Sequence, residues 1–299
     1  MSINNINHED VKNALSQSDA QWEADITIFS SLPIEKQKIY LGAKPPEHEP
    51  SIEEIEQRVS SKKESLRSEA LQATGVPTSY DLRNVGGKNF ITEVKDQKSC
   101  GSCVAFGTIA TAEGSMRVQN NNPNRAVDFS EAQLFFCYGA ESGATCDSGW
   151  WPPYAYDAFQ KKGVVDEDCY RYDDGLEKKD CSGLCADADS RKMRISGYTD
   201  LTGKPAQIKE WISSNGPVSA CFIVYQDFMQ FYKGGIYKHV TGEKLGGHCV
   251  SIIGYNDDEG YWICKNSWAT IWGEQGFFRI AYGECGIDSW SNHGVEWGC

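Results

Sequence analysis

The sequence lacks long apolar stretches and is short of basic residues. Its longest apolar runs, such as Pro217–Tyr225, fall far below the roughly 20 residues that a membrane-spanning helix needs. Lys and Arg number 29 against 42 Asp and Glu, which gives a net charge of -13, and no cluster of Lys or Arg offsets it. Phosphate backbones and anionic lipid surfaces would repel such a chain. We therefore expect neither a membrane protein nor a nucleic-acid partner.

The chain also begins without a signal-peptide pattern, because residues 1–12 show no basic start followed by an apolar segment. Its 12 cysteines nevertheless favour an oxidising compartment over the cytosol. We expect a secreted protein, or one of a lysosome-like compartment, in which Met1 stands in place of a removed signal. The sequence contains no internal repeat, and 299 residues suffice for one large domain or two smaller ones.

Residues 1–75 differ in composition from the rest of the chain. They contain no cysteine and a single tryptophan, Trp22, and they are rich in Glu, Lys, Ser and Gln. Apolar spacing predicts helices over 8–17 and 32–43, the second with Pro33 near its start and Gly42 at its end. The prolines of 44–51 then form a linker that no helix can cross.

A third helix is predicted over 51–75. Ser51 and Glu54 have the spacing of a capping box at its start, and Gly75 is the expected stop. Its apolar residues lie along one side, which predicts docking onto another surface; they are Ile52, Ile55, Val59, Leu66 and Leu71.

From Val76 onward the chain is rich in glycine, cysteine and aromatic residues. Past Pro217 the pattern changes to strands, with turns of Gly, Asn and Asp between the segments 217–225, 247–255, 261–268 and 276–283. Because helical segments come first and strands later, we expect an α+β fold with two halves.

Cys100 and Cys103 form a C-x-x-C pair that admits three interpretations. A redox dithiol stays open, since the preceding residues could form a short strand. A zinc site needs a second ligand pair, and Cys181 and Cys185, with no histidine beside them, are the only close candidates. The third interpretation, a nucleophile beside a structural cysteine, needs a histidine and an orienting polar residue elsewhere in the chain.

His248 is the best of the five histidines for that role. It follows two glycines and opens an apolar strand, and a turn centred near Asp257 places it opposite Asn266. Of the other histidines, His8 and His48 lie in the polar N-terminal region. His239 and His293 have loop-like surroundings and are expected to be solvated.

From about Val76 to Trp290 the chain resembles the papain-like cysteine proteases. The matching segments, in family order, are DQKSCGSCVAF, FSEAQLFFC, TCDSGWW, GPVSACFIV, YKGGIYKH, GGHCVSIIGY and YWICKNSWATIWGEQGFFRI. His248 lies within the roughly 130–150 residues beyond Cys103 at which the family places its histidine, and Asn266 lies slightly farther. One departure is Val104, which stands where the family usually has an aromatic residue.

The resemblance implies a catalytic role for four residues. Cys103 is the nucleophile at a helix N-terminus, His248 its base and acid, Asn266 the residue that orients the imidazole, and Gln97 an oxyanion-hole donor. It implies that substrate is bound by Gly149, Trp150, Trp151, Cys221, Gly247, Trp268 and Trp290. No metal or cofactor is expected.

Trp290 determines the pocket expected for the substrate residue two positions before the scissile bond. Where relatives that accept Arg carry a carboxylate, this chain has an indole, so a buried guanidinium would be unpaired. We expect an apolar, shallow pocket that takes Val or Leu and rejects Arg and Lys.

The resemblance also implies two disulfides, Cys100–Cys146 and Cys137–Cys181. Cys169–Cys185 and Cys285–Cys299 are further expected pairs, while Cys221, Cys249 and Cys264 are expected to be buried thiols. The expected fold is α+β with a helical left lobe and a β-barrel-like right lobe. We expect a peptidase domain over 76–299 and, over 1–75, a mostly helical prosegment that blocks the cleft.

These features predict a secreted, monomeric cysteine endopeptidase made as a proenzyme, with protein or peptide substrates and its own prosegment as an intramolecular inhibitor. Internal cleavage is expected because the helical half contains no loop with two histidines. Two alternatives stay open: a thiol-disulfide oxidoreductase that uses Cys100 and Cys103, and a catalytically silent papain-fold binding protein.

Overall fold

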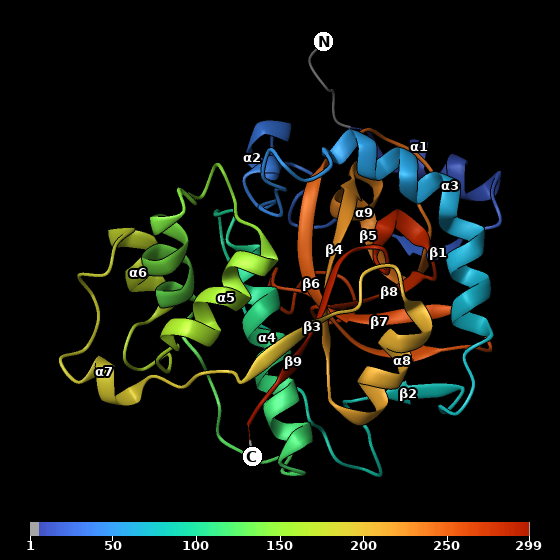
Figure 1. Cartoon of the computed structure of the whole chain (residues 1–299). Coiled ribbons are helices and arrows are strands. Elements are labelled where there is room, and N and C mark those ends of the chain that lie inside the picture. Colours follow the sequence, from blue (N-terminus) through green and yellow to red (C-terminus); the bar gives the residue numbers. More distant parts are fainter. Residues whose placement is uncertain (1–5, 299) are drawn as a thin grey trace.

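A computed structural model describes residues 6–298 as two lobes with an N-terminal region laid across them (Figure 1). The first half of the chain contains α1 (His8–Ser16), β1 (Gln21–Ala24), α2 (Ile34–Lys38), α3 (Ile52–Leu71), β2 (Ser79–Asp81), α4 (Cys103–Gln119), η1 (Gln133–Gly139) and α5 (Pro152–Lys162). The second half contains α6 (Tyr172–Lys178), α7 (Ala188–Arg191), β3 (Gly197–Asp200), α8 (Pro205–Ser214), β4 (Val218–Tyr225), α9 (Gln226–Phe231), β5 (Tyr232–Tyr237), β6 (Lys244–Asn256), β7 (Tyr261–Lys265), β8 (Phe277–Ala281), η2 (Glu284–Gly286) and β9 (Trp290–Glu296).

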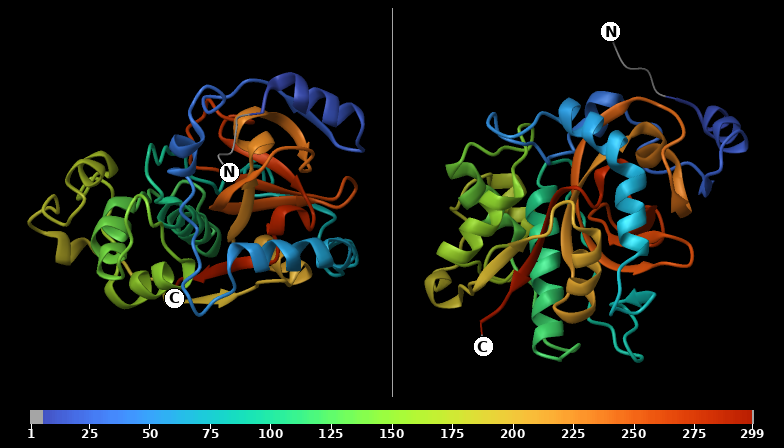
Figure 2. Two further views of the ribbon diagram at one scale, coloured as in Figure 1. Left: turned by 90° about the horizontal axis from the view of Figure 1, so that it is seen from above. Right: turned by 45° about the vertical axis from the view of Figure 1, so that its right-hand side comes forward.

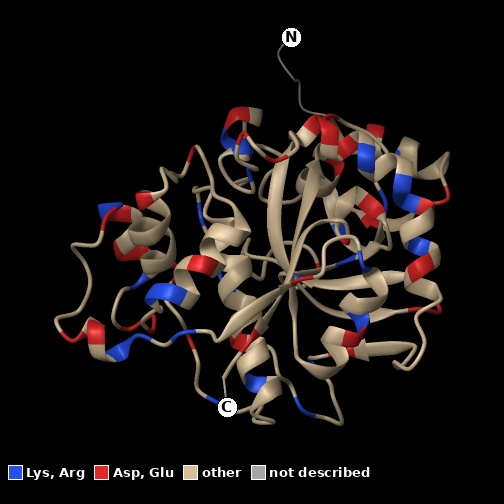
Figure 3. Ribbon diagram, viewed as in Figure 1, with Lys and Arg blue, Asp and Glu red and all other residues tan. Residues whose placement is uncertain are grey.

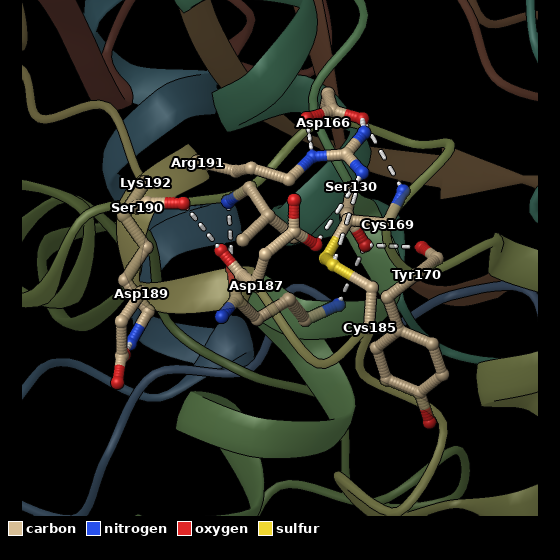
Figure 4. The surroundings of a disulfide bond; sticks show 12 residues. Ser130, Asp166, Cys169, Tyr170, Cys185, Asp187, Asp189, Ser190, Arg191 and Lys192 are labelled. Atoms are coloured by element: carbon tan, nitrogen blue, oxygen red, sulfur yellow. Dashed lines mark hydrogen bonds and ion pairs between the residues drawn. A yellow bond between two sulfur atoms is a disulfide. The ribbon is translucent and has the colours of Figure 1, made fainter.

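The helical lobe consists of α4, η1, α5, α6 and α7, on the left of Figure 1. Its central helix is α4, which carries small and apolar residues on every side and is therefore buried almost all round. Three disulfides bind the outer segments to this core, and all three were expected: Cys100–Cys146, Cys137–Cys181 and Cys169–Cys185. Beside the last of these, Arg191 Nε donates to Asp166 at 2.8 Å (Figure 4).

The second lobe is built on one nine-stranded sheet. Its strands follow the order β1-β5-β8-β7-β6-β4-β9-β3, with β2 paired to β6. The predicted α+β class is confirmed, but the expected barrel is not closed, because β1 and β3 end the ladder without pairing to each other. The long strand β6 and its neighbour β4 are buried on both faces, as their nearly unbroken apolar sequences require.

The hairpin of β6 and β7 differs from its expected register. Ser251 pairs with Lys265 and Ile252 with Cys264, so the turn is centred one residue later than Asp257. Asn266 therefore lies just beyond the end of β7 and is not the backbone partner of His248. The expected side-chain pairing of these two residues still occurs, because the chain bends after Lys265.

Between residues 6 and 75, the N-terminal region has three helices and one strand. β1 pairs antiparallel with the edge of β5, an addition that the helical prediction missed. In Figure 2, seen from above, the chain then passes between the two lobes and continues into α3, which lies along the sheet lobe. The sequence of β1 is short and gives no strand signal of its own. The strand forms because it pairs with β5, which lies far away in the chain.

α3 confirms the predicted start and corrects the predicted end. Ser51 and Glu54 form the capping box, but the helix ends at Leu71 and does not reach Gly75. Its buried face includes Ile55, Val59 and Leu66 as expected, with Ala70 in place of Leu71, which is 43% exposed. α2 likewise starts after Pro33 but ends at Lys38, well before Gly42.

Two groups of residues lie in surroundings other than those expected. His293 is buried on β9 between Tyr156 and Tyr198, and His239 stacks on Tyr225, so neither is simply solvated. Cys285 is a free buried thiol whose Sγ donates to Glu284, so the expected bridge to Cys299 is not supported; Cys299 itself lies outside the described residues. Cys221, Cys249 and Cys264 are free and buried, as expected.

Charged residues are interspersed over the ribbon. Figure 3 shows acidic and basic positions alternating along the outer helices and α3, without a continuous basic stretch in that view. No helix within residues 6–298 is both long and apolar enough to span a membrane.

Candidate active site

Cys103 is the first residue of α4, and its side chain is completely buried. The helix N-terminus points unpaired backbone N–H groups toward this end, which favours a thiolate. Here, however, burial and then the neighbouring Cys249 raise the pKa of the Cys103 thiol to about 12. Its Sγ accepts a hydrogen bond from the backbone N–H of Gly42 at 3.3 Å. The thiol is therefore protonated and covered in this form of the protein.

His248 and Asn266 lie together, as the sequence predicted. The Nε2 of His248 donates to Oδ1 of Asn266 at 2.7 Å, and the ring stacks on Trp268 at a centroid distance of 4.5 Å. The Nδ1 atom is buried and has no hydrogen-bond partner among the described residues. Burial lowers the pKa of His248 to about 4, although the bond to Asn266 acts in the opposite direction. The imidazole is therefore neutral at physiological pH in this form.

β6 brings His248 to the N-terminal part of α4. Cys249, the next residue, has its sulfur against Gly107, one turn along α4 from Cys103. A backbone hydrogen bond from Cys249 to the Cys103 thiol is among the causes that act on the pKa of that thiol. Cys103 and His248 thus lie on two elements, α4 and β6, that pack together at the interface between the lobes.

Gln97 is fixed on both sides of its amide. Its Oε1 accepts a hydrogen bond from Ser267 Oγ at 2.7 Å, and its Nε2 donates to the carbonyl oxygens of Cys100 at 2.8 Å and Tyr40 at 2.9 Å. The side chain is fully buried and so is no solvated loop residue. A donor held in this way can bind a carbonyl oxygen placed beside Cys103.

Residues 40–44 occupy the cleft beside these groups. Gly42 O accepts from the backbone N–H of Trp150 at 2.8 Å, and the N–H of Ala43 donates to Gly247 O at 3.1 Å. A Cβ on Gly42 would lie 1.8 Å from the carbonyl oxygen of Gly101, so only glycine fits this position. The N-terminal region therefore passes directly over Cys103.

A sequence profile described as papain family cysteine protease matches residues 76–294. The chain belongs to the papain family of cysteine proteases. It is 35% identical to cathepsin B-like CP3 of Giardia intestinalis over 227 residues, which cover 73% of this chain and 74% of that protein. It is 34% identical to the gut-specific cysteine proteinase of Caenorhabditis elegans over 242 residues, which cover 72% of each chain.

Solved proenzymes of the papain family share the whole fold. The structure of procathepsin B S9 from Trypanosoma congolense aligns with a TM-score of 0.75 at 23% identity, covering 97% of this chain and 98% of the other. The recombinant stem bromelain precursor aligns with a TM-score of 0.71 at 23% identity, covering 97% and 88%. Both alignments extend through the N-terminal region, so that region has a proenzyme-like arrangement.

The structure places the expected substrate-binding residues around the cleft. Gly149 and Trp150 lie beside Gly42, and Gly247 beside Ala43. Cys221 pairs with Trp290 in the sheet, and Trp151 lies near the Trp290 ring at a centroid distance of 6.4 Å. Trp268 covers His248 and is itself covered by Phe29 of the N-terminal region.

The residues that block the cleft were not foreseen individually. Tyr40 and Gly42 make the contacts to Gln97 and Cys103, and Gly101 leaves room for Gly42. The only sequence signal was the small pair Gly42 and Ala43, which can pass through a narrow cleft in extended form. The contacts of Tyr40 and Gly42 with Gln97 and Cys103 join residues far apart in the chain, so local sequence patterns do not predict them.

The space next to Trp290 differs from the expected shallow apolar pocket. A cavity of about 180 Å³ lies there, lined by Trp151 and Trp290 but also by Ser289, Ser291 and His293. A β-bulge explains the position of Trp290: Ala220 pairs with Asn292 and Cys221 with Trp290, so Ser291 is the extra residue and takes a φ of 55°. The ring consequently lies against Gly247.

Cys100 is bonded to Cys146. A dithiol made of Cys100 and Cys103 is therefore absent, which removes the observation on which the oxidoreductase alternative depended.

Proposed function

We propose that the chain is the proenzyme of a cysteine endopeptidase whose Cys103 and His248 hydrolyse peptide bonds. The observation that carries this proposal is the convergence of Cys103, Gln97 and the hydrogen-bonded pair His248 and Asn266 on one covered cleft. The family's chemistry requires a thiol, a base, an orienting residue and an oxyanion donor, and this chain supplies all four.

Catalysis begins when the cleft is uncovered. Water then solvates both groups, which reverses the burial that keeps the thiol and the imidazole neutral, and the proton of Cys103 passes to Nδ1 of His248. The thiolate attacks the carbonyl carbon of the scissile bond, and the backbone N–H of Cys103 and Nε2 of Gln97 bind the resulting oxyanion. Each such donor contributes about 3 kcal/mol in comparable acyl-transfer enzymes.

The intermediate collapses with cleavage of the C–N bond. His248 gives its proton to the departing amine, and water hydrolyses the remaining thioester to release the acid and restore the Cys103 thiol. Asn266 holds the imidazole by its Nε2–H throughout, and Trp268 covers that hydrogen bond from water. Val104 is buried in the helical lobe and replaces a ring near the nucleophile, which leaves the proton-transfer groups complete.

The region 1–75 acts as the intramolecular inhibitor. It runs from Phe29, which packs on Trp268 at 5.0 Å, across Cys103 to Val59, which lines the cavity beside Trp290. A substrate, whose residues before the scissile bond bind near Trp290, runs the other way. At Cys103 the inhibitor donates the backbone N–H of Gly42 to Sγ, so the thiol is engaged as a hydrogen-bond acceptor. The inhibitor therefore fills the cleft without being cut there.

The remaining features of the proposal follow from the chain's composition and bridges. Three disulfides suit a secreted or lysosome-like location. We assign the prosegment to 1–75 and the peptidase domain to 76–299, acting as a monomer on proteins or peptides. The helical lobe between residues 76 and 200 contains no histidine, which supports internal cleavage over trimming of chain ends.

One labelling experiment tests the function. Matured protein is treated with a peptidyl epoxide, digested and analysed by mass spectrometry, while a parallel sample is assayed on internally quenched peptides blocked at both ends. Alkylation of Cys103 alone, with loss of peptide cleavage, supports an endopeptidase. Folded matured protein that cleaves no blocked peptide would favour the catalytically silent binding protein instead.

A further inference from the structure

The cavity beside Trp290 has one aromatic end and one polar end. The aromatic end is formed by Trp151 and Trp290, whose ring planes are inclined at 39°. It adjoins the cleft, because the Trp290 ring lies against Gly247 and Gly247 O binds the chain in the cleft. The other end reaches Asp200 and His293, which are paired on β3 and β9. Since β3 is the far edge strand of the sheet, this end points away from the cleft.

Four buried polar atoms around this cavity have no hydrogen-bond partner in the described part of the chain. They are Nε1 of Trp290, Oγ of Ser289, Oγ of Ser291 and Nδ1 of His293. Buried polar groups in folded proteins are almost always paired with protein or ordered water. Such a concentration of unpaired groups around one cavity indicates a site that a polar ligand group completes.

The prosegment covers the cavity without using these atoms. Ile55 and Val59 of α3, both hydrocarbon, form part of its wall, together with Glu49, Pro50 and Arg58, and no hydrogen bond joins any of them to the four unpaired atoms. When residues 1–75 leave, this wall is removed, and the cavity joins the cleft at Trp151 and Trp290. The polar end then becomes accessible to a substrate side chain.

We propose that in the matured enzyme this cavity binds a tyrosine side chain of the substrate, with the ring packed against Trp151 and Trp290 and the hydroxyl at the polar end. The inference depends on the proposed peptidase function and names its preferred substrate class. An apolar body with a polar tip matches the two ends of the cavity.

The donors and acceptors distinguish tyrosine from the charged side chains. Trp290 Nε1 can only donate, and so can the ammonium of Lys and the guanidinium of Arg, so a cationic side chain leaves the indole N–H unpaired even where Asp200 or a serine Oγ accepts from it. A phenolic hydroxyl both accepts and donates, and can bond Trp290 Nε1 together with a serine Oγ or the neutral His293. Asp200 at the same end disfavours a carboxylate. Phe and Leu fill the aromatic end but leave the polar atoms unpaired.

The test uses four blocked peptides that differ only in the residue two before the scissile bond, which is Tyr, Phe, Leu or Arg. For the wild-type enzyme we expect kcat/KM for Tyr to exceed that for Phe by roughly five-fold, the effect of one net hydrogen bond. Arg should also fall below Tyr, because it leaves the Trp290 N–H unpaired. A value for Phe equal to or above that for Tyr would overturn the inference.

Two variants locate the effect in the cavity. Ser291→Ala removes a hydroxyl and should bring the Tyr to Phe ratio towards one while leaving cleavage of the Leu peptide within about two-fold. Trp290→Phe removes the N–H but keeps a ring and should likewise bring that ratio towards one. Ser213→Ala, a partly exposed serine on α8 that does not line the cavity, is the matched control and should keep the wild-type ratio. A ratio unchanged in both cavity variants would contradict the assignment. Failure to cleave any of the four peptides would instead contradict the peptidase function itself.

Discussion

Lys209 of α8 donates a hydrogen bond to the carbonyl oxygen of Ala70 at 2.8 Å, so a buried lysine of the peptidase domain holds the last turn of α3. The same ammonium pairs with both carboxylate oxygens of Asp257 at 2.7 Å and lies over the ring of Tyr255. α3 has no basic residue in its own last turn, so this cation is supplied from outside the helix. The prosegment is thus attached to the enzyme at both the cleft and the far end of α3.

Lys209→Met should destabilise the proform by about 3–5 kcal/mol, because it leaves Asp257 partly buried without its cation. Urea unfolding monitored by tryptophan fluorescence measures this change. The double variant with Asp257→Asn should recover a large part of the loss, since both charges are then gone. A loss of stability in the double variant equal to the sum of the losses in the two single variants would show that the pair is not coupled.

Gly42→Ala should weaken the block of the cleft. The new Cβ would meet the Gly101 carbonyl at 1.8 Å, and overpacking of this kind costs about 1–3 kcal/mol, or roughly 5–150-fold in the closed population. Purified proform carrying this change should therefore cleave a small peptide substrate and mature at least several-fold faster than wild type. Gly298→Ala, where a Cβ meets only an ordinary contact with Ser196 at 3.6 Å, should behave as wild type.

Cys103→Ala should give a folded, full-length chain that does not mature. We propose that the thiolate cuts its own prosegment in or near residues 71–77, where the chain leaves α3, and the alanine variant has no nucleophile. Incubation at mildly acidic pH, followed by electrophoresis and mass determination, tests this. Trimmed product from the purified variant without added protease would exclude self-processing.

Asn266→Ala should lower activity less than His248→Ala. His248 transfers the proton, a role worth roughly 10²–10⁴-fold, whereas Asn266 only holds the ring in place through its Oδ1. We expect a loss of about tenfold for the asparagine variant in kcat/KM on matured enzyme. Equal losses in two well-folded variants would contradict this division of roles.

The proform should lose stability as the pH falls from about 6.5 towards 4. Burial lowers the pKa of His248 and of His293 to about 4, so in this window the unfolded chain binds protons that the folded chain does not. Each histidine then contributes a fall of up to about 1.4 kcal/mol per pH unit. In the Cys103→Ala background, urea unfolding at several pH values measures the slope, and His293→Gln should reduce it. An identical slope in that variant would show that His293 is not buried in neutral form.

Local rules predicted the parts of this fold that depend on neighbouring residues. The capping box of Ser51 and Glu54 and the helix that begins at Cys103 follow from short patterns. The partnership of His248 and Asn266 was also correct, although the pairing register behind it was off by two residues. Side chains near a hairpin end can meet from several registers, so the chemistry was easier to predict than the backbone pairing.

Contacts between distant segments were outside the reach of those rules. His293 has loop-like neighbours in sequence, yet β3 and α5 bring Tyr198 and Tyr156 against it. The path of Gly42 over Cys103 and the polar end of the Trp290 cavity likewise depend on how α3 and β9 lie on the enzyme. Periodicity describes one segment at a time and contains no information about such packing.

The strand that the prosegment adds to the sheet has a consequence for the matured protein. Trp22 of β1 packs on Tyr232 and Tyr237, and β1 is hydrogen-bonded along β5. Maturation as proposed removes this strand, and β5 becomes an open edge with unpaired backbone groups and two uncovered tyrosines. Open edges invite pairing with other chains and aggregation. The proform is therefore the form better suited to accumulation at high concentration, and the matured enzyme the one that tolerates crowding with its own copies less well.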